Sequence, residues 1–415
     1  MFTNYIKIAW KVLLRHPFYT FITLLGISFA LTVLMVLTSF LDHLVGSHYP
    51  ETNRYRTLYV DRMVLTNQEK NMMNSGPMSF KFLTDQARTL KTPERVTIFS
   101  GDSRSNTYVG SRKIELNFRF TDAEYWRVLN FEFLEGKPYN EQTIANSEPV
   151  AVITDGFKKQ YFDDPAESAV GKRIEIENIA YTVIGVVKGS PVTRQFSYSD
   201  VFFPYNNPKS NYRSVEYGGE YMAMIQAKSE ADLPAINDEF QARINRIPIT
   251  DIQAGFKGGL LEVNSAPFIR YLMNLLLEGD TSRVAPVYGA IVFILFMLIG
   301  LPVINLVNLN VSRILERASE IGIRKAFGAP IRTLLWQFII ENIFITLIGG
   351  AIALVLTFGI IQIINTSGWI PYIALTINAN IFIISLFTCL FFGLLSGLLP
   401  AIRMSKLNIA DALKA

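Results

Sequence analysis

Residues 311–337, VSRILERASEIGIRKAFGAPIRTLLWQ, combine charged and glycine residues at helical spacing between two long apolar segments. Glu320 precedes Arg324 by one turn, which is the favourable order for an ion pair on a helix, and Arg324 falls where a cation interacts well with the helix dipole. Gly328 can adopt the left-handed conformation that ends a helix, and Pro330 suits the first turn of the next helix. The segment therefore predicts a helix, a tight corner and a second helix.

Residues that could catalyse a reaction or hold a ligand form no recognisable site. Val-Gly-Lys-Arg at 170–173 has the look of a phosphate-binding loop, but Ala166 stands where that loop needs its first glycine and Arg173 where it needs Ser or Thr, so we interpret the stretch as a turn before a strand. His43 and His48 lack the spacing of a zinc motif, and no Gly-x-Ser-x-Gly sequence marks a nucleophile. We therefore expect neither enzyme activity nor a cofactor in this chain.

Half of the 415 residues are hydrophobic, and four apolar segments reach the ~20 residues with which a helix crosses a bilayer. They are residues 18–41, 286–309, 338–364 and 377–400. The first is too long and too late for a signal peptide, so we expect a retained anchor. Only the third contains a charge, Glu341, about one turn from its start. We expect snorkelling or a polar helix contact there in preference to a proton relay, because the other apolar segments offer no charged partner.

Basic residues indicate which loops face the cytoplasm. Segments 1–17, 311–332 and 401–415 contain eleven basic and three acidic residues, whereas loop 365–376 contains neither. The basic residues are Lys7, Lys11, Arg15, Arg313, Arg317, Arg324, Lys325, Arg332, Arg403, Lys406 and Lys414, and the acidic residues are Glu316, Glu320 and Asp411. Both termini and the 311–337 corner are therefore predicted to be cytoplasmic. The net charge of +4 reflects this topology and does not indicate nucleic-acid binding.

The long segment between the first two apolar runs, residues 42–285, mixes strand and helix patterns and predicts an α+β domain. Its expected strands are Thr57–Val64, Val96–Phe99, Ser105–Val109, Lys113–Phe120, Val150–Ile153, Val201–Pro204 and Tyr221–Ala227, with a hairpin of Arg173–Glu177 and Ala180–Val187 that turns at Asn178. Its expected helices are Phe80–Leu90, Asp122–Leu129 after Thr121, Gly156–Tyr161, Leu233–Ile244 and a stalk over Ser265–Leu277. The single cysteine, Cys389, allows no disulfide within the chain, so the domain must be held by its own core.

The decapeptide Glu320–Ala329, EIGIRKAFGA, resembles the cytoplasmic signature of the FtsX-like permease domain found in MacB-type ABC transporters. The resemblance implies a coupling helix that docks on an ATPase. The residues to which it assigns this role are Glu316, Arg317, Glu320, Ile321, Gly322, Arg324, Lys325 and Gly328. The alternative is an ordinary cytoplasmic loop, whose arginines and lysines only set the topology.

Two further stretches are similar to the same family. Phe120–Pro191 resembles the periplasmic core domain of MacB-type permeases, with Val-Gly-Lys at 170–172 and Tyr-Thr-Val-Ile-Gly-Val-Val at 181–187, although the turn near Leu134–Lys137 is one residue short of the family pattern. The tail from Gly397 resembles the closing pattern of the family, with asparagine at 408 where proline is more usual. Residues 192–285 share only the order of a strand followed by a helix.

The resemblance implies a membrane α-helical protein with four transmembrane helices and a large α+β extracytoplasmic domain inserted between spans one and two. The expected segments are a cytoplasmic amphipathic helix at 1–17, spans at 18–41, 286–309, 338–364 and 377–400, a periplasmic core domain with stalk at 42–285, a coupling helix and corner at 310–337, an external loop at 365–376 and a cytoplasmic tail at 401–415. The protein would lie in the bacterial inner membrane, with the large domain in the periplasm.

The family's partners and activity follow from the same resemblance. It implies a cytoplasmic ABC ATPase dimer, which supplies the ATP and Mg²⁺ sites, a second permease copy or paralogue, and in efflux systems a periplasmic adaptor and an outer-membrane channel. The expected function is to transmit ATP-driven motion to the periplasmic domain for export of a drug, peptide or toxin. Lipoprotein extraction uses the same architecture. A signalling scaffold that regulates cell-wall hydrolases is an alternative of another class, but the large external region favours the first two.

Overall fold

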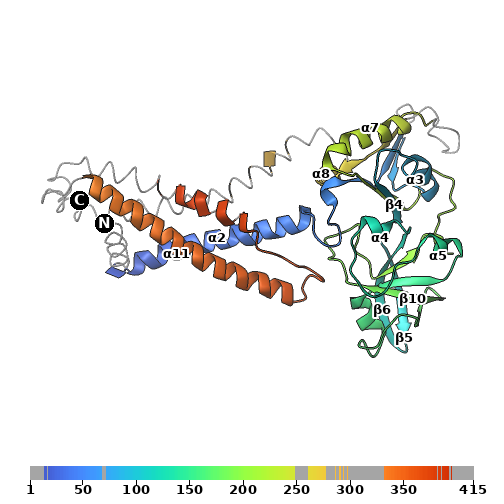
Figure 1. Cartoon of the computed structure of the whole chain (residues 1–415), viewed down its shortest axis with the longest axis horizontal. Coiled ribbons are helices and arrows are strands. Elements are labelled where there is room, and N and C mark those ends of the chain that lie inside the picture. Colours follow the sequence, from blue (N-terminus) through green and yellow to red (C-terminus); the bar gives the residue numbers. More distant parts are fainter. Residues whose placement is uncertain are drawn as a thin grey trace. The chain divides into compact units, whose positions relative to one another are not determined.

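The structure is a computed structural model that describes residues 14–15, 17–67, 72–247, 260–276, 331–380, 382–384 and 386–391, with single residues at 286, 289, 290, 293, 297 and 394. The chain divides into two compact units (Figure 1). The helical unit comprises residues 1–43, 282–369 and 374–415, and the α+β unit comprises residues 44–281 and 370–373. Each unit is described separately below.

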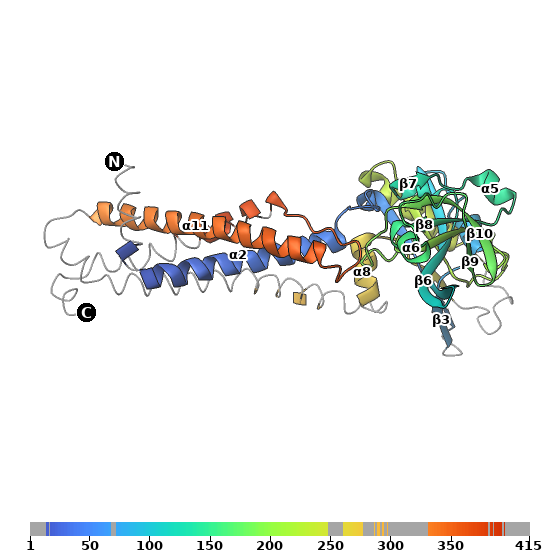
Figure 2. The same ribbon diagram turned by 90° about the horizontal axis from the view of Figure 1, so that it is seen from below.

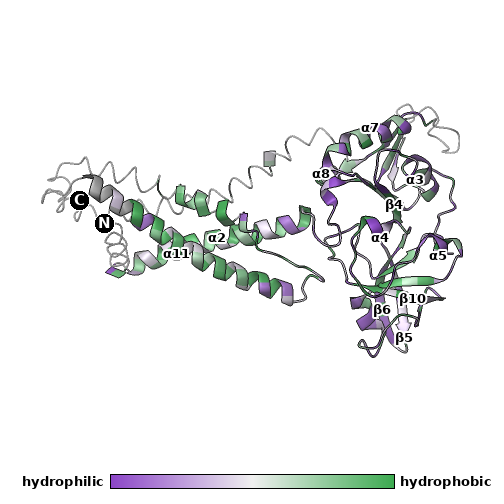
Figure 3. Ribbon diagram, viewed as in Figure 1, coloured by the Kyte–Doolittle hydropathy of each residue, from purple (hydrophilic) through white to green (hydrophobic). Residues whose placement is uncertain are grey.

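Two long apolar helices lie side by side in the helical unit: α2, Pro17–Val45, and α11, Ile331–Thr366 (Figure 2). Their stretches Thr20–Val45 and Ile339–Thr366 are long and apolar enough to cross a membrane, and most of both ribbons is coloured as hydrophobic in Figure 3. The predicted spans 18–41 and 338–364 fall within these helices. The predicted span 286–309 lies largely outside the described residues. The predicted span 377–400 is described only in part and contains a shorter apolar helix over Phe382–Phe391.

Small side chains of α11 face α2. A methyl group added to Gly349 would lie 2.7 Å from Cγ2 of Ile27 in α2, and the Thr32 hydroxyl of α2 donates a hydrogen bond to the Ala353 carbonyl at 3.4 Å. Gly349 and Ala353 are one turn apart, so they form a stripe along which the two backbones approach closely. A methyl group added to the neighbouring Gly350 would lie 2.8 Å from Cδ1 of Leu386. The Gly349-Gly350 pair therefore allows close approach of neighbouring helices.

The α+β unit is built on an eleven-stranded sheet. Its strand order is β14-β1-β12-β4-β6-β11-β8-β10-β7, with β5 paired to β6 and β9 paired to β10, and a second sheet has the order β13-β2-β3. The strands are β1 Thr57–Val60, β2 Met63–Asn67, β3 Met72–Gly76, β4 Arg95–Ser100, β5 Ser103–Val109, β6 Arg112–Thr121, β7 Phe133–Gly136, β8 Val150–Thr154, β9 Arg173–Ile176, β10 Ile179–Val187, β11 Val201–Pro204, β12 Tyr221–Gln226, β13 Leu260–Val263 and β14 Ala266–Pro267.

Short helices accompany these strands. They are α3 Phe80–Gln86, α4 Tyr125–Val128, α5 Glu141–Ala145, α6 Asp155–Tyr161, α7 Leu233–Ile244 and α8 Phe268–Leu276, together with 3-10 turns at Arg54–Arg56 and Glu230–Asp232. The strand pairs are antiparallel except β8 with β10 and β6 with β11. The mixed pairing and the segregated helices confirm an α+β domain.

Both faces of the large sheet are covered by apolar side chains. In β1, Leu58 and Val60 belong to one buried cluster, while Tyr59 between them belongs to a second cluster. In β11, Phe202 points to that second cluster and Phe203 to the first. Because successive strand residues point to opposite faces, this alternation places a core on each side of the sheet.

Several sequence predictions hold and some are wrong. α7 has the predicted bounds, and the predicted hairpin is β9-β10, where Glu177 and Asn178 both have positive φ as its two-residue turn requires. The single strand predicted over Thr57–Val64 is wrong, because the chain passes from β1 in the large sheet to β2 in the small one. The stalk predicted from Ser265 begins instead with β14, which pairs with β1, and α8 follows it.

The helix predicted over Asp122–Leu129 is also wrong in length, because α4 is a single turn. The buried Asp122 carboxylate accepts hydrogen bonds from the backbone nitrogens of Tyr125 at 2.9 Å and of Ile98 in β4 at 2.8 Å. It therefore joins the turn to the sheet, in place of a longer helix capped by Thr121. The predicted turn near Leu134 is strand β7, in which Gly136 has a φ of 65° and lies against the Ile184 carbonyl.

Because small residues of α11 face α2, a larger side chain on α11 should destabilise the helical unit only at the positions that face α2. Replacing Gly349 by leucine should destabilise the helical unit by about 1–3 kcal/mol, because the added side chain overlaps Ile27. Gly359→Leu is the matched control, since a methyl group built at this position of the same helix meets no described atom within 4 Å. Thermal unfolding of the detergent-solubilised protein measures both variants, and equal midpoints for the two would contradict the packing described here.

Candidate functional site

A buried ion pair lies where the chain enters the α+β unit after α2. Glu51 and Arg54 are 2% and 3% exposed, and Nη2 and Nε of Arg54 donate to the same Glu51 carboxylate oxygen at 2.6 and 3.0 Å. The other carboxylate oxygen accepts from the Ser197 hydroxyl at 2.9 Å, and the Tyr59 hydroxyl lies 3.4 Å from the first. A buried carboxylate needs such additional donors to offset its lost hydration.

Arg54 also contacts the end of α2 and the start of α8. Its Nη1 donates to the carbonyl of Leu44 at 2.5 Å, in the last turn of α2, where helix carbonyls lack partners of their own. Its Cζ lies 3.5 Å from the ring centroid of Phe268, the first residue of α8, in a cation–π contact. One guanidinium therefore holds the end of one helix and the start of another.

The loop of residues 194–197 makes similar contacts with the chain just after α2 and with α8. Arg194 is fully buried and donates to the Gly46 carbonyl at 3.0 Å, and the amide of Gln195 is hydrogen-bonded to the Tyr271 hydroxyl of α8. Nη2 of Arg119, in β6, donates to the Gln195 carbonyl at 2.7 Å and so ties the loop to the sheet. We call Glu51, Arg54, Tyr59, Arg194, Ser197, Phe268 and Tyr271 the junction cluster.

Aromatic rings fill the space around these polar contacts. Phe196 lies 4.8 Å from Tyr59 and 5.0 Å from Tyr271 between ring centroids, and Tyr59 lies 5.5 Å from Phe268. Burial raises the pKa of Tyr59 well above its usual value and that of Tyr271 to about 12, so both hydroxyls keep their protons at neutral pH. The cluster is thus a closely packed, hydrogen-bonded connection.

The junction cluster is a set of structural contacts in the described residues. In the part of the chain that the structure describes, no group of three His, Cys, Asp or Glu side chains could hold a metal ion. The Val-Gly-Lys stretch at 170–172 forms a turn before β9, with Gly171 at a φ of 86°, as the turn interpretation requires. The charged groups of the junction cluster are engaged with one another and with backbone carbonyls.

Two sequence profiles match this chain. The MacB-like periplasmic core domain matches residues 20–243, and the FtsX-like permease C-terminal domain matches residues 292–409. The chain belongs to the MacB/FtsX-like permease family.

Its relatives include ABC transporter components. The macrolide export ATP-binding/permease protein MacB of Haemophilus ducreyi is 24% identical over 427 residues, which cover 98% of this permease and 55% of the relative. The uncharacterized ABC transporter permease YknZ of Bacillus subtilis is 24% identical over 291 residues, which cover 70% of this permease and 68% of YknZ. This permease therefore spans about half the length of the MacB proteins that it matches.

Two solved structures align with part of this permease. The extracellular domain of YknZ has a TM-score of 0.36 at 13% identity and covers 50% of this chain and 99% of its own. The periplasmic region of MacB from Actinobacillus actinomycetemcomitans has a TM-score of 0.35 at 15% identity and covers 53% and 92%. Because both scores are below 0.5, the family assignment rests on the sequence matches.

The coupling residues predicted for this permease lie outside the described residues. They are Glu316, Arg317, Glu320, Ile321, Gly322, Arg324, Lys325 and Gly328, so their role stays a prediction. Glu341 lies in α11, and its side chain is 2% exposed within the helical unit. The junction cluster was missed from the sequence, although one signal was available: Glu51 and Arg54 are opposite charges three residues apart, close behind an apolar segment.

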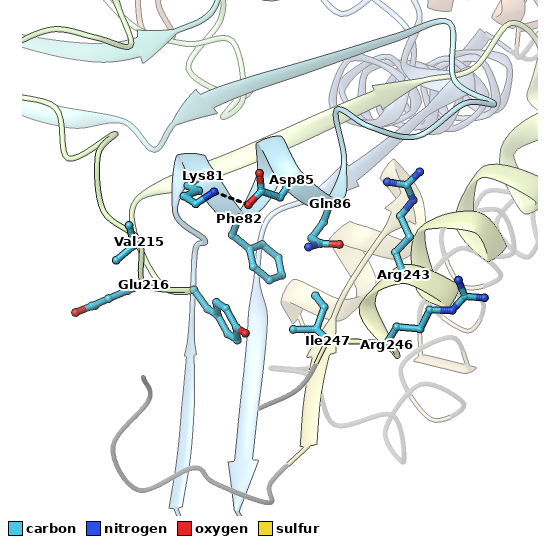
Figure 4. A pocket seen from close by; sticks show the side chains of 10 residues that line it. Lys81, Phe82, Asp85, Gln86, Val215, Glu216, Arg243, Arg246 and Ile247 are labelled. Atoms are coloured by element: carbon cyan, nitrogen blue, oxygen red, sulfur yellow. Dashed lines mark hydrogen bonds and ion pairs between the residues drawn. The ribbon is translucent and has the colours of Figure 1, made fainter. Parts of the chain in front are cut away.

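An open hollow of about 620 Å³ lies elsewhere on the α+β unit, between α3, residues 215–217 and the end of α7 (Figure 4). Its lining mixes both signs of charge, and Lys81 and Asp85 form an ion pair at 2.8 Å along α3, on one wall of the hollow. Arg243 is held by the Thr89 carbonyl at 2.7 Å. This mixture points to no particular ligand class.

Removing one member of the buried pair should be far more costly than breaking an exposed pair. Glu51→Ala leaves the Arg54 guanidinium buried without its carboxylate and should lower the free energy of unfolding by about 3–5 kcal/mol. The control is Glu94→Ala, which removes the partner of Arg56 at a site where Glu94 is 34% exposed and should cost below about 1 kcal/mol.

Tryptophan fluorescence can report this unfolding directly. Trp126 is the only one of the four tryptophans within the α+β unit, so replacing Trp10, Trp336 and Trp369 by phenylalanine isolates its signal. The protein is unfolded with denaturant in detergent. Similar losses for the two glutamate variants would contradict a special role of the buried pair.

A carboxyl beside the junction loop should make stability depend on pH. Burial raises the pKa of Asp102 to about 6, although Arg119 opposes the shift. A raised folded pKa stabilises the protein below the unfolded value near 3.8, and this stabilisation is lost as the pH rises through 6. Asp102→Asn should therefore gain stability relative to the parent between pH 4 and 7, on the order of 1 kcal/mol after allowance for solvent screening. The free energy of unfolding of both proteins is measured between pH 4 and 7. The same pH dependence for the two proteins would contradict a raised pKa of Asp102.

Proposed function

We propose that this chain is the permease subunit of an ABC transporter in which a separate cytoplasmic ATPase dimer drives motion of the α+β unit. The family membership supports a permease, and the name of the H. ducreyi relative, a macrolide export ATP-binding/permease protein, supports export of a drug-like, peptide or toxin cargo. ATP and Mg²⁺ would bind to the partner ATPase. Cargo would be handled outside the membrane, because the apolar segments offer no charged pathway.

The proposed topology has four spans in the bacterial inner membrane, with both termini cytoplasmic and the α+β unit periplasmic. Two apolar helices in the described residues and two further apolar segments in the sequence support the count. The excess of basic residues in segments 1–17, 311–332 and 401–415 supports the orientation. A second permease copy or a paralogue would complete the membrane part, and an adaptor and an outer-membrane channel would extend the export path.

The junction cluster carries the proposal. Its buried arginines hold backbone carbonyls at the end of α2, and its aromatic and amide contacts hold α8, which precedes the apolar segment 286–309. The two chain segments that enter and leave the α+β unit are therefore fixed to the same buried group. A shift of either segment would move the sheet as a body, which is the behaviour that a transmitted two-state motion needs.

Variants at the two ends of this path test the proposal by ATPase co-purification and by efflux. Glu320→Lys or Gly328→Val, in the predicted coupling helix, should abolish co-purification with the partner ATPase while membrane insertion is unchanged. Arg54→Lys keeps the positive charge but loses the planar fork that bonds Glu51 and Leu44 together. It should keep the ATPase bound yet reduce macrolide efflux from cells about tenfold.

Asp411→Lys serves as the control, because it reverses a charge in another predicted cytoplasmic segment and should leave ATPase binding intact. Normal ATPase co-purification by Glu320→Lys and Gly328→Val would reject the coupling role. Undiminished efflux by a folded Arg54→Lys protein would reject transmission through the junction cluster.

A further inference from the structure

Four residues that follow α11 in sequence, Ile370–Ile373, belong to the α+β unit. Within that unit the Tyr372 side chain reaches the N-terminus of α6. Its hydroxyl forms hydrogen bonds with the side chains of Thr154 and Asp155 and with the backbone of Gly156, and burial raises its pKa far above the usual value. Thr154 is the N-cap of α6, so the hydroxyl lies among the first residues of the helix.

Two glycines make room for the ring. A methyl group built on Gly156 would overlap the Tyr372 hydroxyl, and one built on Gly189 would overlap the ring itself. Neither glycine has the left-handed φ that would demand glycine on conformational grounds, and in a helix such as α6 alanine is ordinarily preferred. The space that Tyr372 occupies therefore accounts for glycine at both positions.

The walls of this space are connected to each other and to the segment after α2. The Asp155 carboxylate accepts a hydrogen bond from the Gly189 nitrogen at 2.9 Å. The Tyr49 hydroxyl donates to the carbonyl of Lys188, the residue before Gly189, at 2.6 Å. The site is thus built into the framework of the unit. We call Thr154, Asp155, Gly156 and Gly189 the tyrosine socket.

The segment that carries Tyr372 is shaped as a closed loop. The Asn365 side chain bonds both the nitrogen and the carbonyl of Leu375, at 2.9 and 3.0 Å, and so joins the two ends of the loop. Tyr372 has a φ of 59°, which is uncommon for a residue with a side chain, and Gly368 a φ of 69°. A non-glycine residue held in this conformation points to a constraint imposed by its contacts.

We propose that the tyrosine socket is a docking site for residues 370–373, with the Tyr372 ring filling the socket. Both the socket and these four residues belong to the α+β unit. The docking itself requires no transport partner.

Photo-crosslinking in the full-length, detergent-solubilised protein tests the docking. p-Azidophenylalanine at position 372 should crosslink to peptides containing residues 154–156 or 188–190, whereas the same probe at Trp369, which is 78% exposed, should not. Gly156→Ala with Gly189→Ala should reduce the crosslink about fivefold or more. Gly76→Ala is the control, because a methyl group there meets no atom within 4 Å. Crosslinks that map elsewhere, or that survive the double replacement, would overturn the proposal.

A double-mutant cycle gives a second test that does not depend on the probe. Gly189→Ala should lower the thermal midpoint of the parent protein but should have little effect once Tyr372→Ala has removed the ring, so the two changes should be strongly non-additive. Additive effects would overturn docking. Co-purification of the ATPase is measured in parallel, because its absence in the parent would reject the proposed function while leaving the docking result intact.

Discussion

The Glu51–Arg54 pair is the contact on which the attachment of the α+β unit depends. Its members are three residues apart, but its remaining donors and acceptors come from the end of α2, from β1, from the loop before β11 and from α8. A buried ion pair adds little net stability compared with apolar residues of the same size, yet it tolerates no missing partner. Its effect is therefore to fix position: every segment that contributes a group must be in place for the charges to be satisfied.

This requirement explains how the last residues of α2, which belong to the α+β unit, are held in place. A helix that ends at the edge of a domain leaves unpaired carbonyls, and flexible solvation of those groups would let the helix pivot. Here buried guanidinium groups take the carbonyls of Leu44 and Gly46, and aromatic rings surround them. The tyrosine socket holds residues 370–373 at another part of the same unit.

Sequence patterns predicted the parts of the fold that depend on neighbours along the chain. The alternation of β6, the turn of the β9-β10 hairpin and the bounds of α7 follow from local periodicity and turn preferences. The switch of the chain between sheets after Val60 depends on the pairing of β1 with β12 and β14, far along the sequence, so alternation alone could not show it.

The junction cluster and the tyrosine socket lay beyond prediction for the same reason. Glu51 and Ser197 are 146 residues apart, and Arg194 and Gly46 are 148 apart. The residues next to either partner in the sequence give no indication of the other partner. The opposite charges of Glu51 and Arg54 would read equally well as an exposed turn, and Gly156 reads as a minor weakness in a short helix until Tyr372 is placed beside it.

The large sheet has a consequence for recognition. Residues such as Leu58 and Tyr59 bury their side chains in cores on opposite faces, and every residue of β1, β8 and β11 is buried. These central strands offer no open face to another protein, whereas strand margins, connecting loops and the ends of helices do reach the surface. Surface features of that kind can change without disturbing the two cores, because they lie outside them.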